Sequence, residues 1–404
     1  MRKTAKVLSL LLCMTILLCG CETYDNFYNT FFAKEEAPAA EVKTVKIGVF
    51  EPLSGSYAAD AEGEIAGIKL ANKLYPEVLD TPVELVYADN RSEVESCPDA
   101  VKELSEQGVS VILGSCRSTL SLAASDAVAE AGIPAIGVTC TNPIITDTNQ
   151  YYFRVCNIES YEGDAAARFA YYHLGASQAA VLKREGDDFA QALIDTFKTR
   201  MRSCTGSEFS VTVVEYPEGT EDFGPYLFDL STVSSGVVYF PTDPESACLV
   251  IKQAGEADYG FTWIGGSSWE NIEEAVPDYS SSKVRWLDGV CYVSSVDLES
   301  VDTPTAKLFR KAFAEEYGEE AEIPESAVLG FDAYLLALEG IRSAESYTDT
   351  ESIAKRLYNV YKLEGAGGSI SLNSKGDPIK EVPVKKVGAK GHETVYMVVP
   401  QWGD

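Results

Sequence analysis

Val109-Ser-Val-Ile-Leu-Gly114 is a short apolar run, and a helical pattern at residues 119–131 separates it from a second run, Ile133-Pro-Ala-Ile-Gly-Val138. Short apolar runs bounded by turn residues are typical of buried strands, and a helix between two of them favours a parallel pair. The alternation extends toward the N-terminus, with strands expected at residues 45–50 and 83–88 and helices at residues 62–75 and 98–107. This rhythm predicts a parallel, doubly wound sheet.

The rhythm restarts after a strand expected at residues 151–155. Further strands are expected at residues 179–182, 210–216, 236–240, 261–264 and 289–293, and helices at residues 161–172, 189–201 and 245–254. Late helices follow at residues 304–317, 326–343 and 350–361, and a β tail at residues 382–387 and 393–399 closes the chain. We therefore predict an α/β fold of two doubly wound parallel-sheet lobes with an interlobe cleft, which is the usual place for a small ligand.

The composition is that of a globular protein with an acidic surface. Of the 404 residues, 46% are hydrophobic and 24% are charged, which are ordinary values. The formal net charge is −29. Because such a field repels phosphate backbones, nucleic acid is not an expected partner. We expect a monomer whose main partner is a small molecule.

The first 20 residues are typical of a secretion signal. Arg2 and Lys3 precede an apolar segment at residues 7–18, which is too short to span a bilayer because a span needs about 20 apolar residues. The segment ends in Leu18-Cys-Gly-Cys21, which resembles the lipobox of bacterial lipoproteins. The resemblance implies a lipoprotein signal peptide at residues 1–20, lipid on Cys21 and an extracytoplasmic protein anchored to the membrane. Residues 21–43 are predicted to form the lipidated Cys and a polar, Ala/Pro-rich tether.

The sequence carries little that indicates a metal, a cofactor or catalysis. Seven cysteines follow Cys21 without a C-x-x-C pair, and the two histidines, His173 and His392, are far apart. A zinc site needs N or S ligands at close spacing, so we predict no metal site and no cofactor. Gly265-Gly-Ser-Ser-Trp269 is not the G-x-S-x-G motif of hydrolases, so we do not expect an enzyme.

Five segments, taken in order, resemble one family of proteins. They are Val45-Lys-Ile-Gly-Val-Phe-Glu-Pro-Leu-Ser-Gly-Ser-Tyr-Ala58, Gly108-Val-Ser-Val-Ile-Leu-Gly-Ser-Cys-Arg-Ser-Thr119, Ala131-Gly-Ile-Pro-Ala-Ile-Gly-Val-Thr-Cys-Thr-Asn-Pro143, Asp187-Asp-Phe-Ala-Gln191 and Gly330-Phe-Asp-Ala-Tyr334. The segments are similar to those of the solute-binding proteins that serve ABC transporters for branched-chain amino acids (Leu, Ile and Val). The resemblance covers nearly everything from Thr44 to about Lys386 and implies the type I periplasmic-binding fold.

The resemblance also implies how the chain divides between the lobes. Together with the restart of the β-α rhythm, it predicts lobe one at residues 44–157 plus 296–383. Lobe two is predicted at residues 158–295 plus 384–404. The chain would then cross between the lobes three times.

An amino acid lies between the lobes in the resembled family, and the resemblance assigns its headgroup to Ser118, Thr139 and Thr141. Ser118 follows a predicted strand and is placed to cap the helix from Thr119, where free N–H groups and the positive helix end favour a carboxylate. A plain helix cap is the alternative role for this serine. Thr139 and Thr141 match positions that touch the amino group and the carboxylate of the ligand.

The remaining candidate positions depart from the family. Ser267 stands where the resemblance implies an acidic residue for the ligand ammonium, and a buried ammonium needs a carboxylate partner. Asp60 and Asp243 replace aromatic residues and are candidates for that partner, although both are also typical turn residues. Phe189 replaces a cleft-facing Tyr, so it would keep a packing role, and Trp269 is a candidate wall of the cleft.

Two cysteines, Cys97 and Cys116, fall close to a pair that forms a disulfide in the resembled family. The resemblance therefore implies a disulfide within lobe one, in keeping with an oxidising compartment outside the cytoplasm.

These observations predict a lipid-anchored solute-binding protein without catalysis, which captures an amino acid or a related small polar ligand for an ABC permease. A ligand-sensing module for a membrane receptor would use the same fold and stays an alternative. A secreted hydrolase is the third hypothesis, and the missing nucleophile motif disfavours it.

Overall fold

The computed structural model describes residues 43–276, 285–294, 297–298, 300–389 and 391–399. The predicted signal peptide, Cys21 and the tether up to residue 42 lie outside the described residues. Within the described ranges, no helix is both long enough and apolar enough to cross a bilayer.

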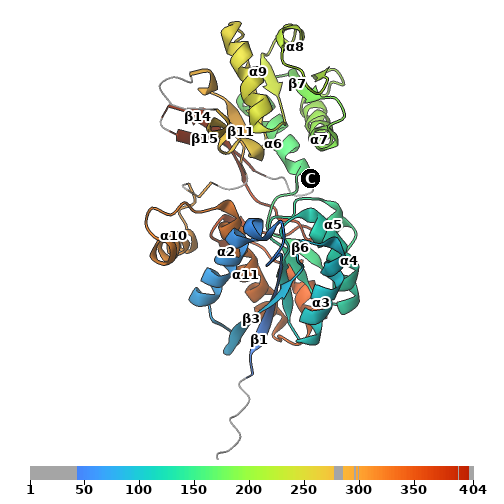
Figure 1. The fold of residues 1–404 in the computed structure, drawn as a ribbon, viewed down its shortest axis with the longest axis vertical. Coiled ribbons are helices and arrows are strands. Elements are labelled where there is room, and N and C mark those ends of the chain that lie inside the picture. Colours follow the sequence, from blue (N-terminus) through green and yellow to red (C-terminus); the bar gives the residue numbers. More distant parts are fainter. Residues whose placement is uncertain (1–42, 277–284, 295–296, 299, 390, 400–404) are drawn as a thin grey trace, which may run out of the picture. The chain divides into compact units, whose positions relative to one another are not determined.

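The first sheet has six strands among the described residues, in the order β2-β3-β1-β4-β5-β6, and Figure 1 labels β1, β3 and β6. Their bounds are Val45–Glu51 (β1), Glu77–Val78 (β2), Thr81–Asp89 (β3), Val111–Gly114 (β4), Ala135–Gly137 (β5) and Tyr152–Arg154 (β6). All neighbouring strands pair in parallel except β2, which is antiparallel to β3. The carboxyl ends of the parallel strands therefore meet at one edge, where open α/β sheets bind ligands.

Helices cover both faces of the first sheet. α2 (Ala58–Leu74), α10 (Pro304–Tyr317) and α11 (Glu325–Ala344) share a core with Val45, Ile47 and Val49 of β1. α3 (Cys97–Glu106) and α4 (Ser118–Ala131) share the other core, which Phe50 of β1 joins. Because side chains alternate between the faces of a strand, the continuous apolar run of β1 serves both cores.

Two glycines let α2 and α11 approach until their backbones touch. A Cβ added at Gly67 would lie 1.9 Å from the carbonyl oxygen of Ala327, and one added at Gly330 would lie 2.2 Å from that of Glu64. The contact places the start of α11, which comes late in the chain, beside the segment of α2 that carries Glu64.

The second sheet has the order β15-β14-β11-β10-β9-β7-β8 within the described ranges. Its strands are Ala179–Arg184 (β7), Val211–Tyr216 (β8), Val237–Tyr239 (β9), Thr262–Gly265 (β10), Cys291–Val293 (β11), Val382–Gly388 (β14) and Gly391–Val398 (β15). α6 (Ser160–Arg168), the π-helical turn at Phe169–His173 and α7 (Asp188–Thr205) share one core with this sheet. α8 (Gly224–Leu230) and α9 (Pro244–Glu256) share the other.

The α/β class with two doubly wound, mainly parallel sheets is confirmed, and the strand direction needs one correction. β14 is antiparallel to both β11 and β15, so the second sheet is mixed at that edge. Only two residues of sequence separate β14 from β15, and so short a connection allows only an antiparallel pair. The boundaries of the lobes stay a prediction, and the crossing expected at residues 295 and 296 lies outside the described residues.

Several short elements were not expected from the sequence. They are α5 (Ile144–Asp147), α8, β2 and the hairpin of β12 (Leu363–Gly365) with β13 (Gly368–Ile370). The helix expected at residues 350–361 ends earlier, as α12 (Thr350–Leu357). None of these segments forms a continuous apolar run or shows a clear helical period, so the pattern alone did not predict them.

The disulfide between Cys97 and Cys116 is not formed in this structure, where both thiols are free and buried. The Cys97 thiol donates to the carbonyl oxygen of Glu93 at 3.3 Å, within the turn that starts α3. Burial, and then the nearby Glu51 carboxyl, raise the pKa of the Cys116 thiol. The two sulfur atoms thus have different partners in this structure, and the pairing implied by the resemblance stays a prediction.

Candidate ligand-binding site

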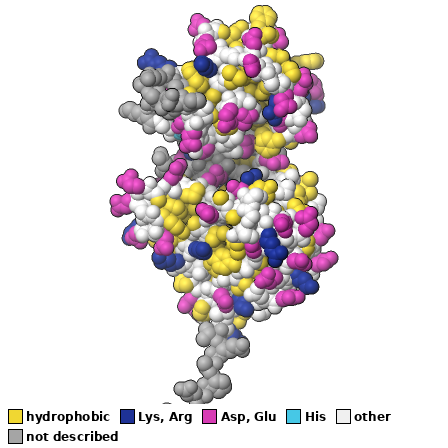
Figure 2. Space-filling view, in the orientation of Figure 1, with side chains coloured by type: hydrophobic (Ala, Val, Ile, Leu, Met, Phe, Trp, Pro, Cys, Tyr) yellow, Lys and Arg dark blue, Asp and Glu magenta, His cyan; other side chains and the backbone are white. Residues whose placement is uncertain are grey.

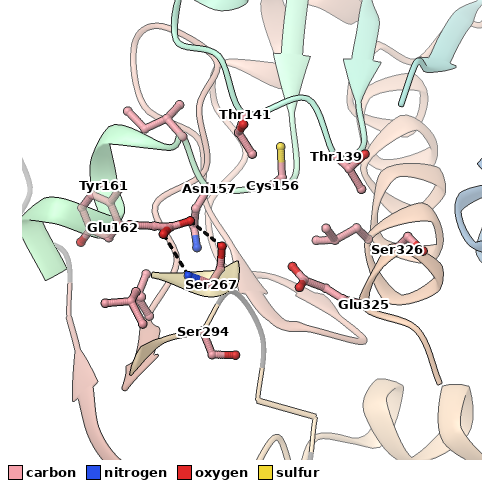
Figure 3. Close-up of a pocket in the computed structure, with 14 residues that line it drawn as sticks. Thr139, Thr141, Cys156, Asn157, Tyr161, Glu162, Ser267, Ser294, Glu325 and Ser326 are labelled. Atoms are coloured by element: carbon pink, nitrogen blue, oxygen red, sulfur yellow. Dashed lines mark hydrogen bonds between the residues drawn. The ribbon is translucent and has the colours of Figure 1, made fainter. Parts of the chain in front are cut away.

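A pocket of about 400 Å³ opens where the carboxyl ends of strands in both sheets meet the first turns of α6 and α11. Figure 3 shows side chains from these elements around one space. Its polar lining comprises Thr139, Thr141, Asn157, Tyr161, Glu162, Ser267, Ser294, Glu325 and Ser326, and its other lining residues are Cys156, Ile158, Val293, Leu329 and Val382. The pocket therefore offers one group of hydroxyls and carboxylates together with an aliphatic surface.

The two threonines come from the loop that follows β5. The Thr139 hydroxyl donates to Oε1 of Glu64, and the Thr141 hydroxyl donates to Oε2 of Glu159 at 3.4 Å. A hydroxyl has one hydrogen and two acceptor lone pairs. Thr139 therefore uses its hydrogen within the protein and keeps a lone pair for a donor in the pocket, whereas the longer contact leaves the Thr141 hydroxyl able to donate or accept.

Glu162 lies in the first turn of α6, and Ser267 follows β10. Oε1 of Glu162 accepts a hydrogen bond from the Ser267 hydroxyl at 2.6 Å, and Oε2 accepts one from the Ser267 backbone N–H at 3.0 Å (Figure 3). Gly266 makes the approach possible, because a Cβ there would lie 2.6 Å from Oε2 of Glu162. Burial raises the pKa of Glu162, and the two hydrogen bonds from Ser267 oppose that rise.

A family model for periplasmic binding proteins matches residues 44–392. The chain belongs to the periplasmic binding protein family. The match spans both sheets and includes every residue that lines the pocket. The pocket can therefore be compared with the binding site of a known class of protein.

Individual relatives of this periplasmic binding protein are distant but cover most of its length. A curated Leu/Ile/Val-binding protein homolog of Brucella melitensis is 23% identical over 349 residues, which is 84% of this chain and 90% of the relative. A leucine-binding protein from Thermotoga maritima is 27% identical with a TM-score of 0.68, covering 88% of this chain and 99% of that one. A branched-chain amino-acid transporter substrate-binding protein from Streptococcus pneumoniae, solved with isoleucine, is 21% identical with a TM-score of 0.66 and covers 89% and 100%.

Behind Thr139, this periplasmic binding protein buries a pair of carboxyl groups, Glu51 and Glu64, both 0% exposed. The Cys116 backbone N–H donates to Oε2 of Glu51 at 2.8 Å, and no Lys or Arg of the described residues forms an ion pair with either carboxyl. Burial raises the pKa of Glu51 to about 7. Burial and then the negative charge of Glu51 raise the pKa of Glu64 well above its ordinary value. The pair therefore holds a proton under conditions where exposed glutamates have lost theirs.

Of the site residues expected from the sequence, Thr139, Thr141 and Ser267 line the pocket. Ser118 does not line it, and its expected role as a helix cap is wrong. α4 begins at Ser118 itself, after Arg117 at φ +68°, and the start of the helix has no side-chain cap. The Ser118 hydroxyl instead accepts a hydrogen bond at 3.2 Å from the Asn142 N–H, next to Thr141.

The other four candidates lie outside the pocket lining and have local partners. Asp60 forms an ion pair with Arg117 at 2.6 Å, and Asp243 caps α9 by accepting from the Ser246 N–H at 2.8 Å. Trp269 is fully buried and donates its indole N–H to the Thr242 carbonyl at 2.9 Å. Phe189, on α7, is 57% exposed, so its expected packing role in the cleft is not seen.

Sequence reasoning missed Glu162 and Glu325, the two carboxylates of the pocket. Both lie in the first turn of a helix, where acidic residues are common because they complement the helix dipole. The sequence held one signal for them. Position 267, where the resemblance implies an acidic residue for the ligand ammonium, is a serine, so another part of the chain would have to supply that residue.

Proposed function

We propose that this periplasmic binding protein captures an amino acid or a related small polar ligand outside the cytoplasm and delivers it to an ABC importer. The observation that carries the proposal is the pocket, which combines hydroxyls, carboxylates and aliphatic side chains from both sheets. An amino acid has the matching parts, a charged headgroup and a side chain. The names of the Brucella and Thermotoga relatives, which refer to leucine, isoleucine and valine, support an amino acid as the ligand class.

Binding alone accounts for the proposed role, and no bond needs to be made or broken. Thr139 and Thr141 would hold the headgroup, while Val293, Leu329 and Val382 would face its side chain. Ser118 would not contact the ligand. Its hydroxyl would instead position the loop with Thr141, by accepting a hydrogen bond from the Asn142 N–H. A ligand that contacts residues from both sheets favours the arrangement in which they come together, and a permease can recognise that arrangement.

A panel of the twenty common L-amino acids at 1 mM tests the proposal. A ligand that binds only the folded protein stabilises it by about 2.7 kcal/mol at a hundred times its Kd, so at least one amino acid should raise the melting temperature by several degrees. Thr141→Val should reduce that shift, because it removes a pocket hydroxyl. Thr199→Val, on α7 away from the pocket, is the matched control and should keep the shift. If no amino acid changes the melting temperature, the proposed ligand class is wrong.

We further propose that Cys21 carries the lipid that holds the protein on the membrane surface. Each buried acyl CH₂ group contributes about 0.8 kcal/mol to the membrane affinity. Cys21→Ala should therefore move the protein from the membrane to the soluble fraction or block its processing. Cys19→Ala is the matched control, because it leaves Gly20-Cys21 intact. Incorporation of labelled fatty acid into the Cys21→Ala protein would contradict the assignment.

A further inference from the structure

The charged residues that line the pocket have one sign. Glu162 and Glu325 are both acidic, and none of the described residues that line the pocket is Lys, Arg or His. Figure 3 shows these two carboxylates on different sides of the same space, one from α6 and one from α11. A pocket with this lining repels a ligand that is only an anion.

The threonine hydroxyls add further acceptor oxygens to the pocket. Thr139 directs its hydrogen to Glu64, so its hydroxyl faces a ligand as an acceptor, and Thr141 can accept as well. An ammonium group has three N–H donors and no acceptor, which is the complement of such a surface.

Glu162 is a pocket carboxylate whose orientation the protein fixes. Both of its oxygens accept from Ser267, and each oxygen keeps a further lone pair. Two donors from one residue fix the plane of the carboxylate, so little side-chain freedom remains to be lost when a cation binds. The alternatives expected from the sequence, Asp60 and Asp243, are outside the lining and bound to Arg117 and Ser246.

We infer that Glu162 is the ammonium-binding residue of the pocket and that Ser267 is the residue that positions it, so that the ligand must carry a primary amine. This inference rests on the proposed function and narrows it, because simple carboxylic acids and 2-hydroxy acids are then rejected. The carboxylate that binds the ligand comes from α6, although the loop after β10 supports it.

Isothermal titration calorimetry with matched ligands tests the inference on the wild type. Each amino acid that raises the melting temperature is compared with its 2-hydroxy analogue, for example L-leucine with 2-hydroxy-4-methylpentanoate, and benzoate serves as an acid without an amine. A site built for an N–H donor rejects the analogue that lacks it, so the amino acid should bind at least about 100-fold more tightly.

Charge-neutral variants identify the residue. Glu162→Gln should weaken amino-acid binding by at least about 30-fold, which is typical for the loss of one partner of a buried charge pair. Asp60→Asn and Asp243→Asn remove the same charge outside the pocket and should stay within about threefold of the wild type. The melting temperature without ligand shows whether each variant is folded.

Ser267→Ala keeps the carboxylate and tests the positioning role by a pH profile. The hydroxyl of Ser267 lowers the pKa of Glu162, so its loss should raise the pH at which binding fails on acidification. The other titratable groups that face Glu162 are Glu159, Tyr239 and Glu325, and all of them remain in this variant. A purely structural role for Ser267 would lower stability without moving the midpoint of the profile.

The outcomes separate this inference from the proposed function. Equal binding of an amino acid and its 2-hydroxy analogue, or Glu162→Gln within threefold of the wild type, would overturn the inference while the solute-binding role stands. Binding of benzoate alone would do the same. A wild type that binds none of these compounds would overturn both.

Discussion

Two neighbouring buried carboxyls, Glu51 and Glu64, are the main unusual feature at the scale of single residues. Both carboxyls are fully buried, and Oε1 of Glu51 and Oε2 of Glu64 have no hydrogen-bond partner among the described residues. Two ionised carboxylates in one apolar site repel each other and lose their hydration, so at least one stays protonated. The pair thereby holds an acceptor oxygen for Thr139, which lines the pocket.

The pair predicts a pH dependence of stability. The unfolded chain loses these protons near the ordinary pKa of 4.5, whereas the folded pKa of Glu51 is about 7. The folded state thus binds more protons between these values, and the free energy of unfolding falls as the pH rises through this window, by on the order of 3 kcal/mol. Glu64→Gln should flatten the fall, whereas the exposed Glu77→Gln should not. Urea unfolding at pH 5 and pH 8 measures this, and equal slopes for wild type and Glu64→Gln would contradict it.

At the scale of elements, the contact between α2 and α11 decides where the late part of the chain lies. Gly67 and Gly330 bring the two helices close enough to place Glu325 and Ser326 at the pocket, near the loop with Thr139. The hydrophobic pattern predicts both helices, since it marks residues 62–75 and 326–343. The pattern does not predict that the two helices touch, because a glycine at the contact does not change the spacing of the apolar residues.

Gly330→Ala tests this contact. The added Cβ would meet the backbone of Glu64, which cannot rotate away as a side chain can. Overpacking of this kind costs about 1–3 kcal/mol or more, which exceeds the gain of about 1 kcal/mol in helix propensity. Urea unfolding should therefore show a lower midpoint. Gly260→Ala, where the new Cβ meets nothing within 4 Å, should change it little. An equal or higher midpoint for Gly330→Ala would show that the helices are not in contact there.

The sequence predicts long elements well and the site only in part. The expected strand at residues 45–50 is Val45–Glu51, and the helix at residues 304–317 is Pro304–Tyr317, because both carry clear apolar patterns. Thr139, Thr141 and Ser267 were expected at the site and line the pocket. Glu162 was missed because its partnership with Ser267 joins positions 105 residues apart, and only the packing of the second sheet brings them together.

At the scale of the whole molecule, an acidic protein with a net charge of −29 has a pocket that is also acidic. Figure 2 shows acidic side chains spread over the visible face, with apolar ones between them. Acidic residues are spread over the surface without a pattern that indicates a ligand. In the pocket, by contrast, Glu162, Thr139 and Thr141 line the same space. The whole fold thus brings segments from residues 139 to 382 to a site for one small ligand.

A crystal structure with the amino acid that gives the largest thermal shift tests this account most directly. We expect the ligand in this pocket, with its ammonium nitrogen about 2.7–3.2 Å from a carboxylate oxygen of Glu162 and with Thr139 and Thr141 beside its headgroup. An amino acid bound elsewhere, or one whose ammonium contacts Asp60 or Asp243 instead of Glu162, would contradict the account.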